Sequence, residues 1–471
     1  MMGHVVALDF GATSGRVILG EVGPKQLRTT THARFANRPV SVHGRLHWDV
    51  LSLWQGALDG LSSAIREVPT VSSIATDTWG VDYGLLRGGE LISNPRHYRD
   101  ERTNPVVDTV QARSSVVEQY AATGIQFMPI NTIYQLAAEA VDARLDLADT
   151  ILLMPDLFTY WLSGARIAET TMASTTGLLD VHSRQWNDSL ISAAGARREL
   201  LPEIVPSGTR VGSLHADVAR QIRAESPVEV VAAGSHDTAS AVTAIPMQPE
   251  TAAFISCGTW GLAGVELESP VVTESARTSG FTNEVGVDGR ILLMRNVMGL
   301  WILSEAVRQW ERDGDAINLP ELIAAASEVS DDMPVVDVDD PRFLPPGNMS
   351  ERIAAWCEER GIRAPATQAE MARCIIESLA QAFADAALSA GALGNVPVRT
   401  IHIVGGGSLN RLLCQRTADR AGIPVLAGPV EATALGSVLV QARSMGHISG
   451  SLDSLRDLVR NTHKPISYRP R

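Results

Sequence analysis

Lysine is almost absent from this sequence of 471 residues, which contains only Lys25 and Lys464 among its 40 basic residues. A Walker A phosphate loop needs a Gly-Lys pair followed by Ser or Thr, whereas these lysines follow Pro24 and His463. Neither lysine has the setting of the phosphate-clamping lysine of protein kinases. If the protein binds a nucleotide, other groups must therefore hold its phosphates.

Positive charge is also scarce overall, because 40 basic residues face 53 acidic ones and the net charge is −13 at pH 7. Nucleic acids and anionic membranes require a basic surface, so the sequence argues against both as partners. No apolar run approaches the roughly 20 residues of a membrane helix. The first residues carry no basic segment ahead of their apolar run, unlike a secretory signal. We therefore expect a cytoplasmic protein with small-molecule substrates.

Cysteine is rare, and its spacing excludes the usual metal sites. None of the four cysteines forms a Cys-x-x-Cys pair or has a histidine at metal-ligand spacing: Cys257, Cys357, Cys374 and Cys414. Cys357 and Cys374 are close enough in sequence to meet, but a lasting disulfide is unusual in the cytosol. We expect reduced, mostly packed thiols.

The length exceeds what one hydrophobic core usually serves, so two domains are expected, with a ligand cleft between them. Apolar strands alternate with amphipathic helices, which predicts an α/β fold with largely parallel strand pairing. The Gly-rich turn "DFGATSGR" follows a predicted strand at residues 5–8, and "SCGTWG" follows one at residues 252–255. Each predicted hairpin opens one half of the chain. We therefore predict two related domains, residues 1–246 and 247–471.

The first hairpin has the composition of a phosphate site. Gly11 and Gly15 allow backbone N–H groups to approach anionic oxygens without obstruction by a Cβ atom. The hydroxyls of Thr13 and Ser14 add donors, and Arg16 adds positive charge. Gly-rich hairpin turns are also common in structural roles, so each hairpin taken alone is open to that interpretation.

Asp9 ends the strand before this turn, where a carboxylate could bind Mg²⁺ through its water shell. The second hairpin offers Gly258 and Thr259 for phosphate binding. Two such hairpins facing one cleft would clamp phosphates without a lysine.

A triple glycine, Gly405–Gly407, separates a predicted strand at residues 401–404 from a helix. Bare backbone at a helix N-terminus favours a nucleotide phosphate. The pattern is not the dinucleotide-binding fingerprint, because Asn410 occupies the position of its last glycine.

The apolar run at residues 228–233 predicts a buried strand, and it ends in the polar pair His236-Asp237. A carboxylate there could accept the proton of a substrate hydroxyl during phosphoryl transfer, which otherwise requires mainly positioning and charge neutralisation. The alternative is structural, with Asp237 or Thr238 capping a helix that begins at Ala239.

Ten segments together resemble the FGGY carbohydrate kinases over residues 5–445, in matching order and spacing. They are "VVALDFGATSGRV", "DTWGVDYGLL", "YRDERTN", "GIQFMPINTIYQL", "LLMPDLFTYWLSG", "SHDTASAV", "SCGTWGL", "RNVMGLW", "IHIVGGGSLNRLLCQ" and "AGPVEATALG". The triple glycine and "EATALG" are typical of the whole family. "DTWGVD", "GIQFMPINT" and "SHDTASAV" resemble the branch that acts on L-rhamnulose.

The resemblance implies two actin-like, ribonuclease H-like domains with a nucleotide- and sugar-binding cleft between them. It implies Mg²⁺- and ATP-dependent phosphorylation of L-rhamnulose at its 1-hydroxyl, in L-rhamnose catabolism. The first domain would bind sugar and end in the catalytic base, and the second would bind nucleotide. Kinases of L-fuculose, L-ribulose or L-xylulose are alternatives, because these sugars differ by single groups. A non-catalytic ATP switch or sugar sensor is more remote, since such proteins need no base like Asp237.

The resemblance also assigns roles to individual residues. Asp237 matches the catalytic base, and Asp9 matches the acidic position associated with magnesium. Sugar contacts match Gly80, His236, Asp237, Thr238 and Asn296. Nucleotide contacts match Ala12, Thr13, Ser14, Gly15, Arg16, Thr259 and Gly406. One position departs from the family, because Ser304 stands where a nucleotide-contacting glutamine is common, so we assign it no role. The sequence does not distinguish a monomer from a homodimer.

Overall fold

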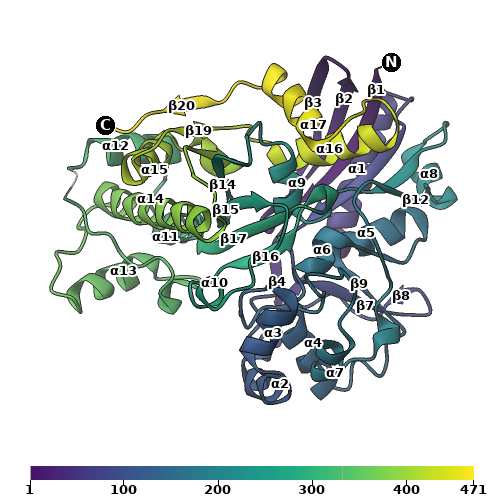
Figure 1. The fold of residues 1–471 in the computed structure, drawn as a ribbon, viewed down its shortest axis with the longest axis horizontal. Helices are drawn as coiled ribbons and strands as arrows, with labels where there is room; N and C mark the ends of the chain where they lie inside the picture. The colour runs from purple at the N-terminus through teal and green to yellow at the C-terminus, as the bar shows by residue number, and fades with distance from the viewer. Residues whose placement is uncertain (1, 331) are drawn as a thin grey trace. The chain divides into compact units, whose positions relative to one another are not determined.

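The computed structural model describes residues 2–330 and 332–471, which form two compact units interleaved along the chain (Figure 1). Unit 1 contains the residues up to Pro246 together with Leu267–Leu293 and Ala432–Thr462. Unit 2 contains Met247–Glu266, Met294–Glu431 and His463–Arg471. The chain leaves unit 1 beside the predicted boundary at residue 246, but it returns to unit 1 twice within the predicted second domain.

Unit 1 is built on a six-stranded sheet with parallel strands at its centre. The strands are β1 (Gly3–Phe10), β2 (Ser14–Gly23), β3 (Gln26–Ala36), β6 (Ser73–Thr78), β12 (Thr209–Ser213) and β13 (Glu229–Ala232). Their order is β12-β13-β6-β1-β2-β3. Strand β6 pairs in parallel with β1 and with β13, whereas β2 pairs antiparallel with β1 and β3. The run predicted as a strand at residues 5–8 lies within β1, and the run at residues 228–233 contains β13.

Helices cover both faces of this sheet: α1 (Val50–Glu67), α5 (Met154–Ser163) and α8 (Ala216–Ile222) on one, α9 (Asp237–Thr243) and α16 (Ala432–Ser444) on the other. Successive strand residues point to opposite faces. Ile74 therefore packs with the core beneath α1 and α5, while Ala75 packs with Val440 of α16. Asp9 lies two residues after Ala7, and Asp77 lies two residues after Ala75. Their side chains therefore point to the same face of the sheet as those alanines, toward α9 and α16.

In the rest of unit 1, Trp48 packs in the first core, the helix Leu452–Thr462 contacts β3 and α9, and most other elements pack around a second hydrophobic core. Its strands are β4 (Pro39–Val42), β5 (Arg45–Trp48), β7 (Tyr83–Arg87), β8 (Glu90–Leu91), β9 (Thr150–Leu153), β10 (Ile167–Glu169), β11 (Glu203–Val205) and β16 (Thr282–Val285). Its helices are α2 (Val107–Arg113), α3 (Val116–Thr123), α4 (Thr132–Val141), α6 (Thr170–Ser174), α7 (Asp188–Ala193), α10 (Glu274–Thr278) and α17 (Leu452–Thr462). Strand β16 lies against α6.

Unit 2 repeats the central arrangement of unit 1. Its strands are β14 (Ala252–Cys257), β15 (Trp260–Leu267), β17 (Ile291–Met298), β18 (Thr400–Val404), β19 (Val425–Ala427) and β20 (Ile466–Tyr468). They follow the order β17-β15-β14-β18-β19-β20. As β1 does with β2 and β6, β14 pairs antiparallel with β15 and parallel with β18. Both predicted hairpins are therefore confirmed.

The helices of unit 2 are α11 (Trp301–Arg312), α12 (Leu319–Glu328), α13 (Met349–Glu358), α14 (Gln368–Leu393) and α15 (Arg411–Ala421). The longest, α14, lies beside α15 and α12 (Figure 1).

The four cysteines are free and buried, so the expectation of packed thiols is confirmed and Cys357 does not pair with Cys374. Across residues 2–330 and 332–471, no helix is both long and apolar enough to cross a membrane.

Candidate active site

Three parallel strand ends bring the predicted chemistry of unit 1 together. In the register of β1 and β6, Asp9 stands opposite Asp77, and an isolated bridge joins Thr78 to His236 just beyond β13. Because the carboxyl ends of parallel strands meet at one edge of a sheet, Asp9, Asp77 and the His236-Asp237 pair occupy that edge. The sequence pattern identified two of these groups but not Asp77.

The first hairpin is held so that its turn carbonyls face the protein. The Asn37 backbone N–H donates to the carbonyl oxygen of Thr13 at 3.0 Å, and its side-chain amide donates to that of Gly11 at 2.9 Å. The Gly11 N–H already donates to the Ser14 carbonyl oxygen at 2.9 Å, so an anion would be bound by the later N–H groups of the turn. Arg16 donates to the Asp9 carboxylate at 2.6 Å. Asn37 was missed because it lies beyond the turn, at the end of the neighbouring strand.

Gly15 has a packing reason that the sequence pattern did not reveal. A Cβ atom at Gly15 would stand 2.2 Å from the Phe35 ring, whereas at Gly11 it would meet only the Ser14 carbonyl oxygen at 3.4 Å. The phosphate role predicted for Gly15 stays a prediction, but close packing against Phe35 already requires a glycine there.

His236 lies between two carboxylates. Its Nδ1 atom is 3.0 Å from Oε2 of Glu284 on β16, and its Nε2 atom is 3.3 Å from Oδ1 of Asp237. Burial lowers the pKa of His236, but the charges of Glu284, Asp237 and Glu169 outweigh it and raise that pKa to about 9. For Asp237 burial has the opposite effect and raises the pKa, and the positive charge of the imidazolium opposes this rise.

The helix after this pair begins earlier than predicted. Helix α9 starts at Asp237, the N-cap position is His236, and no side chain there makes a capping hydrogen bond. The alternative in which Asp237 or Thr238 caps a helix from Ala239 is therefore wrong, because both residues already lie within the first turn. The Thr238 hydroxyl instead donates to Oδ1 of Asp237 at 3.2 Å.

A buried glutamate fixes the loop that carries His236. Glu169 accepts hydrogen bonds from the backbone N–H of Ser235 at 3.2 Å and from the hydroxyl of Ser207 at 2.6 Å. It also caps α6, and the Thr171 hydroxyl of that helix receives the N–H of His236 at 3.1 Å. Glu169 therefore ties the strand end and α6 together, and no local sequence signal indicated this role.

The turn that contains Gly80 is strained. Val81 has φ of 66°, which is rare for a β-branched residue and typical of functional sites. The turn is held by the Thr175 hydroxyl, which accepts the Val81 N–H at 3.2 Å, and by the Thr132 hydroxyl, which donates to the Val81 carbonyl oxygen at 2.6 Å. A Cβ atom at Gly80 would stand 3.3 Å from Thr175, so the turn also requires a small residue.

Asp82, which follows Val81 in the same turn, is held by buried hydrogen bonds. Its carboxylate accepts hydrogen bonds from the indoles of Trp48 and Trp79 and from the amide of Gln135, at 2.5, 3.0 and 2.9 Å. Burial raises the pKa of Asp82 to about 6 despite these three donors. The predicted sugar contact at Gly80 thus sits on a buried polar network that the sequence pattern did not reveal.

Among the groups at the strand edge, Asp77 has the least favourable surroundings for an ionised carboxylate. It is 0 % exposed, and neither carboxylate oxygen has a hydrogen-bond partner among the described residues. Burial raises its pKa well above the ordinary value, and the charges of Asp9 and Asp237 add to this rise, while Arg16 and Ser437 oppose it. Strongly perturbed carboxyls of this kind concentrate at functional sites.

We predict that Asp77→Asn stabilises the protein at pH 8 by about 1–3 kcal/mol, because an unpaired buried carboxylate is costly. A pKa that is raised in the folded state makes wild-type stability fall as pH rises from the unfolded value of about 3.9. The advantage of the variant should therefore vanish near pH 4. Urea unfolding without magnesium at both pH values measures it, with the exposed Asp188→Asn as control. A variant less stable than wild type at pH 8 would show that Asp77 has a favourable ionic partner.

In unit 2, the second hairpin is anchored through its carbonyls as the first is. The Gly258 and Thr259 oxygens accept the backbone N–H groups of Leu300 and Trp301 at 3.1 and 3.2 Å. Gly299 permits this contact, because a Cβ atom there would stand 2.5 Å from the Trp260 carbonyl carbon. Asn296 lies nearby in sequence on β17 and is half-buried.

A cavity of about 1280 Å³ lies within unit 2, between α11, α12 and the start of α15. Gly406, Ser304 and Asn410 line it. The volume exceeds that of most small-ligand sites. Ser304, which stands where relatives commonly have glutamine, therefore lines the same cavity as Gly406, although the sequence analysis assigned it no role.

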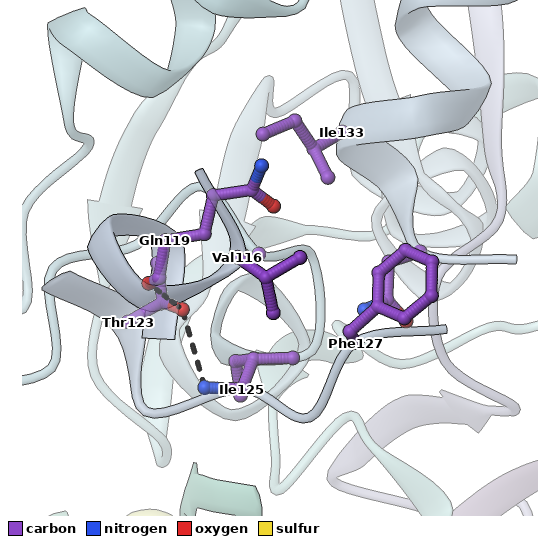
Figure 2. Close-up of a pocket in the computed structure, with 8 residues that line it drawn as sticks. Val116, Gln119, Thr123, Ile125, Phe127 and Ile133 are labelled. Atoms are coloured by element: carbon purple, nitrogen blue, oxygen red, sulfur yellow. Dashed lines mark hydrogen bonds between the residues drawn. The ribbon is translucent and has the colours of Figure 1, made fainter. Parts of the chain in front are cut away.

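The segment "GIQFMPINT" borders a much smaller cavity in unit 1, of about 10 Å³, lined by Gln119, Ile125 and Phe127 among others (Figure 2). This is the space of one water molecule. The predicted sugar contacts do not line it. The segment is therefore not a sugar pocket by itself. In the part of the chain that the structure describes, no cluster of three or more His, Cys, Asp or Glu residues could hold a metal ion.

Comparison with known proteins identifies the family. The model of the FGGY family of carbohydrate kinases matches as its N-terminal domain over residues 4–244 and as its C-terminal domain over residues 253–445. The chain is 37% identical to a rhamnulokinase of Bacteroides thetaiotaomicron, covering 100% of this chain and 96% of the relative. It is 38% identical to a rhamnulokinase of Pectobacterium atrosepticum, covering 99% and 93%.

The fold is similar to that of solved sugar kinases. A gluconate kinase from Lactobacillus acidophilus superimposes with a TM-score of 0.79 at 16% identity, covering 100% of this chain and 94% of that one. This likeness confirms the predicted two-domain α/β fold. With both family domains matched along its length, the chain belongs to the FGGY family of carbohydrate kinases and is an ATP-dependent enzyme of that family.

Proposed function

We propose that this enzyme transfers the γ-phosphoryl group of ATP to the 1-hydroxyl of L-rhamnulose, giving L-rhamnulose 1-phosphate and ADP in the cytoplasm. The observation that carries the choice of sugar is the similarity to two rhamnulokinases, which extends over nearly the full length of each protein. Solved relatives share less than a quarter of their residues with this chain and support the fold only.

Asp237 is the proposed catalytic base. About a third of its side chain is exposed, so the carboxylate can reach a substrate hydroxyl while the rest of the pair stays buried. The neighbouring imidazolium of His236 favours the ionised form of Asp237, which the base needs in order to accept a proton. The hydroxyl proton passes to Asp237 as the oxygen attacks the γ-phosphorus atom.

The remaining roles follow the family pattern. We propose sugar contacts by Gly80, His236 and Thr238 in unit 1 and by Asn296 in unit 2. We propose nucleotide contacts by the turn from Ala12 to Arg16 in unit 1 and by Thr259 and Gly406 in unit 2. In both hairpins the turn carbonyl oxygens are anchored to the protein. The Gly11 and Gly258 N–H groups donate within their own turns, so we propose the later N–H groups of each turn as the phosphate donors.

Asp9 is the proposed residue for Mg²⁺. Oxygen ligands suit this ion, which keeps several waters and often uses one carboxylate together with substrate phosphates. The buried carboxylate of Asp9 beside the phosphate turn fits such a role, as does the unpartnered carboxyl of Asp77 behind it. When bound, the ion would neutralise charge that develops on the phosphates.

A coupled ADP-release assay over a panel of ketoses tests the proposal. We expect the highest kcat/KM with L-rhamnulose, at least tenfold above L-fuculose, L-ribulose, L-xylulose and glycerol, because each loses or misplaces a group that the pocket contacts. Omitting magnesium should abolish turnover. A different best substrate would overturn the choice of L-rhamnulose, and sugar-independent ADP release would overturn its role as a phosphoryl acceptor.

A further inference from the structure

Glu284 contacts the proposed catalytic pair from a part of the chain with no assigned role. It lies on β16, where its neighbours Asn283 and Val285 make structural hydrogen bonds to Val271 and Ser174. Glu284 itself points to His236, and both side chains are less than a tenth exposed. The imidazole is thus enclosed between a buried glutamate on one nitrogen and the half-exposed Asp237 on the other.

The two contacts determine how many protons the imidazole carries. An ionised carboxylate only accepts hydrogen bonds, and a neutral imidazole has one donor and one acceptor nitrogen. Nδ1 of His236 and Oε2 of Glu284 lie at ion-pair distance without hydrogen-bond geometry, so the contact acts through charge. If His236 were neutral, no positive charge would stand beside Asp237, and burial would favour its protonated form, which cannot act as a base. If the imidazole carries both protons, its charge favours ionised Asp237.

We infer that Glu284 is a positioning residue of the reaction, which keeps the proton shared by His236 and Asp237 on the imidazole and so leaves Asp237 ionised. The inference rests on the proposed role of Asp237 as the base. Glu284 touches neither the substrate nor the reacting atoms in this scheme; it acts through His236.

The other charges around the pair make this contact necessary. Asp77 on β6 interacts electrostatically with Asp237, Asp9 and Arg16, and Glu169 at the start of α6 interacts with His236. Burial and the charge of Glu284 itself favour the protonated form of Asp237, and the positive charge of His236, which Glu284 stabilises, opposes them. His236 contacts two carboxylates, the proposed base Asp237 and Glu284. The charge of Glu284 therefore decides whether His236 or Asp237 holds the proton.

The test is the pH dependence of kcat/KM for sugar, which reports ionisation in the free enzyme. In Glu284→Gln the side chain keeps nearly the same shape, but no negative charge stabilises the imidazolium. We expect kcat/KM to fall several-fold at pH 6 relative to wild type, because loss of the imidazolium raises the pKa of the base, and the difference to close by pH 9. Glu284→Asp retains the charge and should keep most of the wild-type profile. Glu268→Gln, an exposed glutamate paired with Arg290, is the matched control and should change nothing.

A second measurement does not depend on whether Glu284→Gln folds. The His236 imidazole of the wild-type protein, labelled with ¹⁵N and assigned by comparison with His236→Gln, should remain protonated at pH 8. A neutral imidazole at pH 7 would overturn the inference, and so would a wild-type pH profile in folded Glu284→Gln. If Asp237→Asn retains its turnover, Asp237 is not the base, and the inference about Glu284 fails together with that proposal. If Asp237→Asn is inactive while Glu284→Gln keeps the wild-type profile, the inference alone fails.

Discussion

Replacing Asp237 by asparagine is expected to lower kcat by about 10²–10⁴-fold, the usual contribution of a general base. Asparagine has nearly the same shape, and its amide oxygen can still accept the Thr238 hydroxyl that contacts Asp237 in the wild type. The backbone of α9 needs no side-chain cap from this residue. The variant should therefore fold and bind sugar, while the 1-hydroxyl keeps its proton and attacks phosphorus poorly.

The chain offers a matched control for this substitution. Asp188 is the first residue of α7, as Asp237 is of α9, but its side chain is 80% exposed. Asp188→Asn removes the same charge from the same helix position, so it should leave kcat unchanged. Coupled ADP release gives kcat, and titration calorimetry gives the sugar affinity. Near-wild-type turnover in Asp237→Asn would rule out its role as the base, whereas lost sugar binding would make it a substrate contact only.

Local patterns predicted the parts of this fold whose causes are local. The strand runs are apolar because both faces of the central sheet are covered, and the two Gly-rich turns mark hairpins whatever lies around them. Helix α1 also has local causes, its apolar spacing and the Asp49 side chain that caps its first turn. The start of α9 was predicted two residues late, because the N-cap position is filled by His236, which makes no capping bond and gives no sequence signal.

The missed site residues act across long sequence distances. Asn37, Asp77 and Glu284 each gain a role from contact with a separate strand or turn, and no spacing rule links them to Gly11, Asp9 or His236. Asp77 stands inside a buried strand, and its significance comes from parallel pairing with β1. The sequence therefore predicted which residues carry the chemistry. It did not predict the surrounding residues, Asn37, Asp77 and Glu284, that position them or affect their protonation.

The triple glycine shows the same limit, because three adjacent identical residues face three different surroundings. Gly405 has φ of 78° and ψ of −165°, a conformation that is essentially restricted to glycine. A Cβ atom at Gly407 would stand 2.2 Å from the Cys257 sulfur. At Gly406 a Cβ atom would meet nothing within 4 Å, and this residue lines the large cavity of unit 2. Only Gly406 lacks a structural reason to be glycine.

Substitutions at these positions should therefore separate stability from nucleotide binding. Gly405→Ala and Gly407→Ala are each expected to destabilise the protein by about 1–3 kcal/mol, through backbone strain at one and overpacking against Cys257 at the other. Gly406→Leu should leave the melting temperature unchanged and raise KM for ATP at least tenfold, which corresponds to about 1.4 kcal/mol of binding. KM for sugar should stay near its wild-type value, because the side chain enters only the cavity.

Thermal melting and the two KM values decide between the roles. Gly406→Ala is the smaller step in the same direction and should show a smaller rise in KM for ATP, since a single methyl group enters a cavity of about 1280 Å³. If Gly406→Leu melts like wild type and binds ATP like wild type, the cavity beside Gly406 is not part of the nucleotide site. If it loses stability instead, the middle glycine has a structural role like its neighbours. A rise in KM for ATP alone would show that the bare backbone of Gly406 is there for the nucleotide.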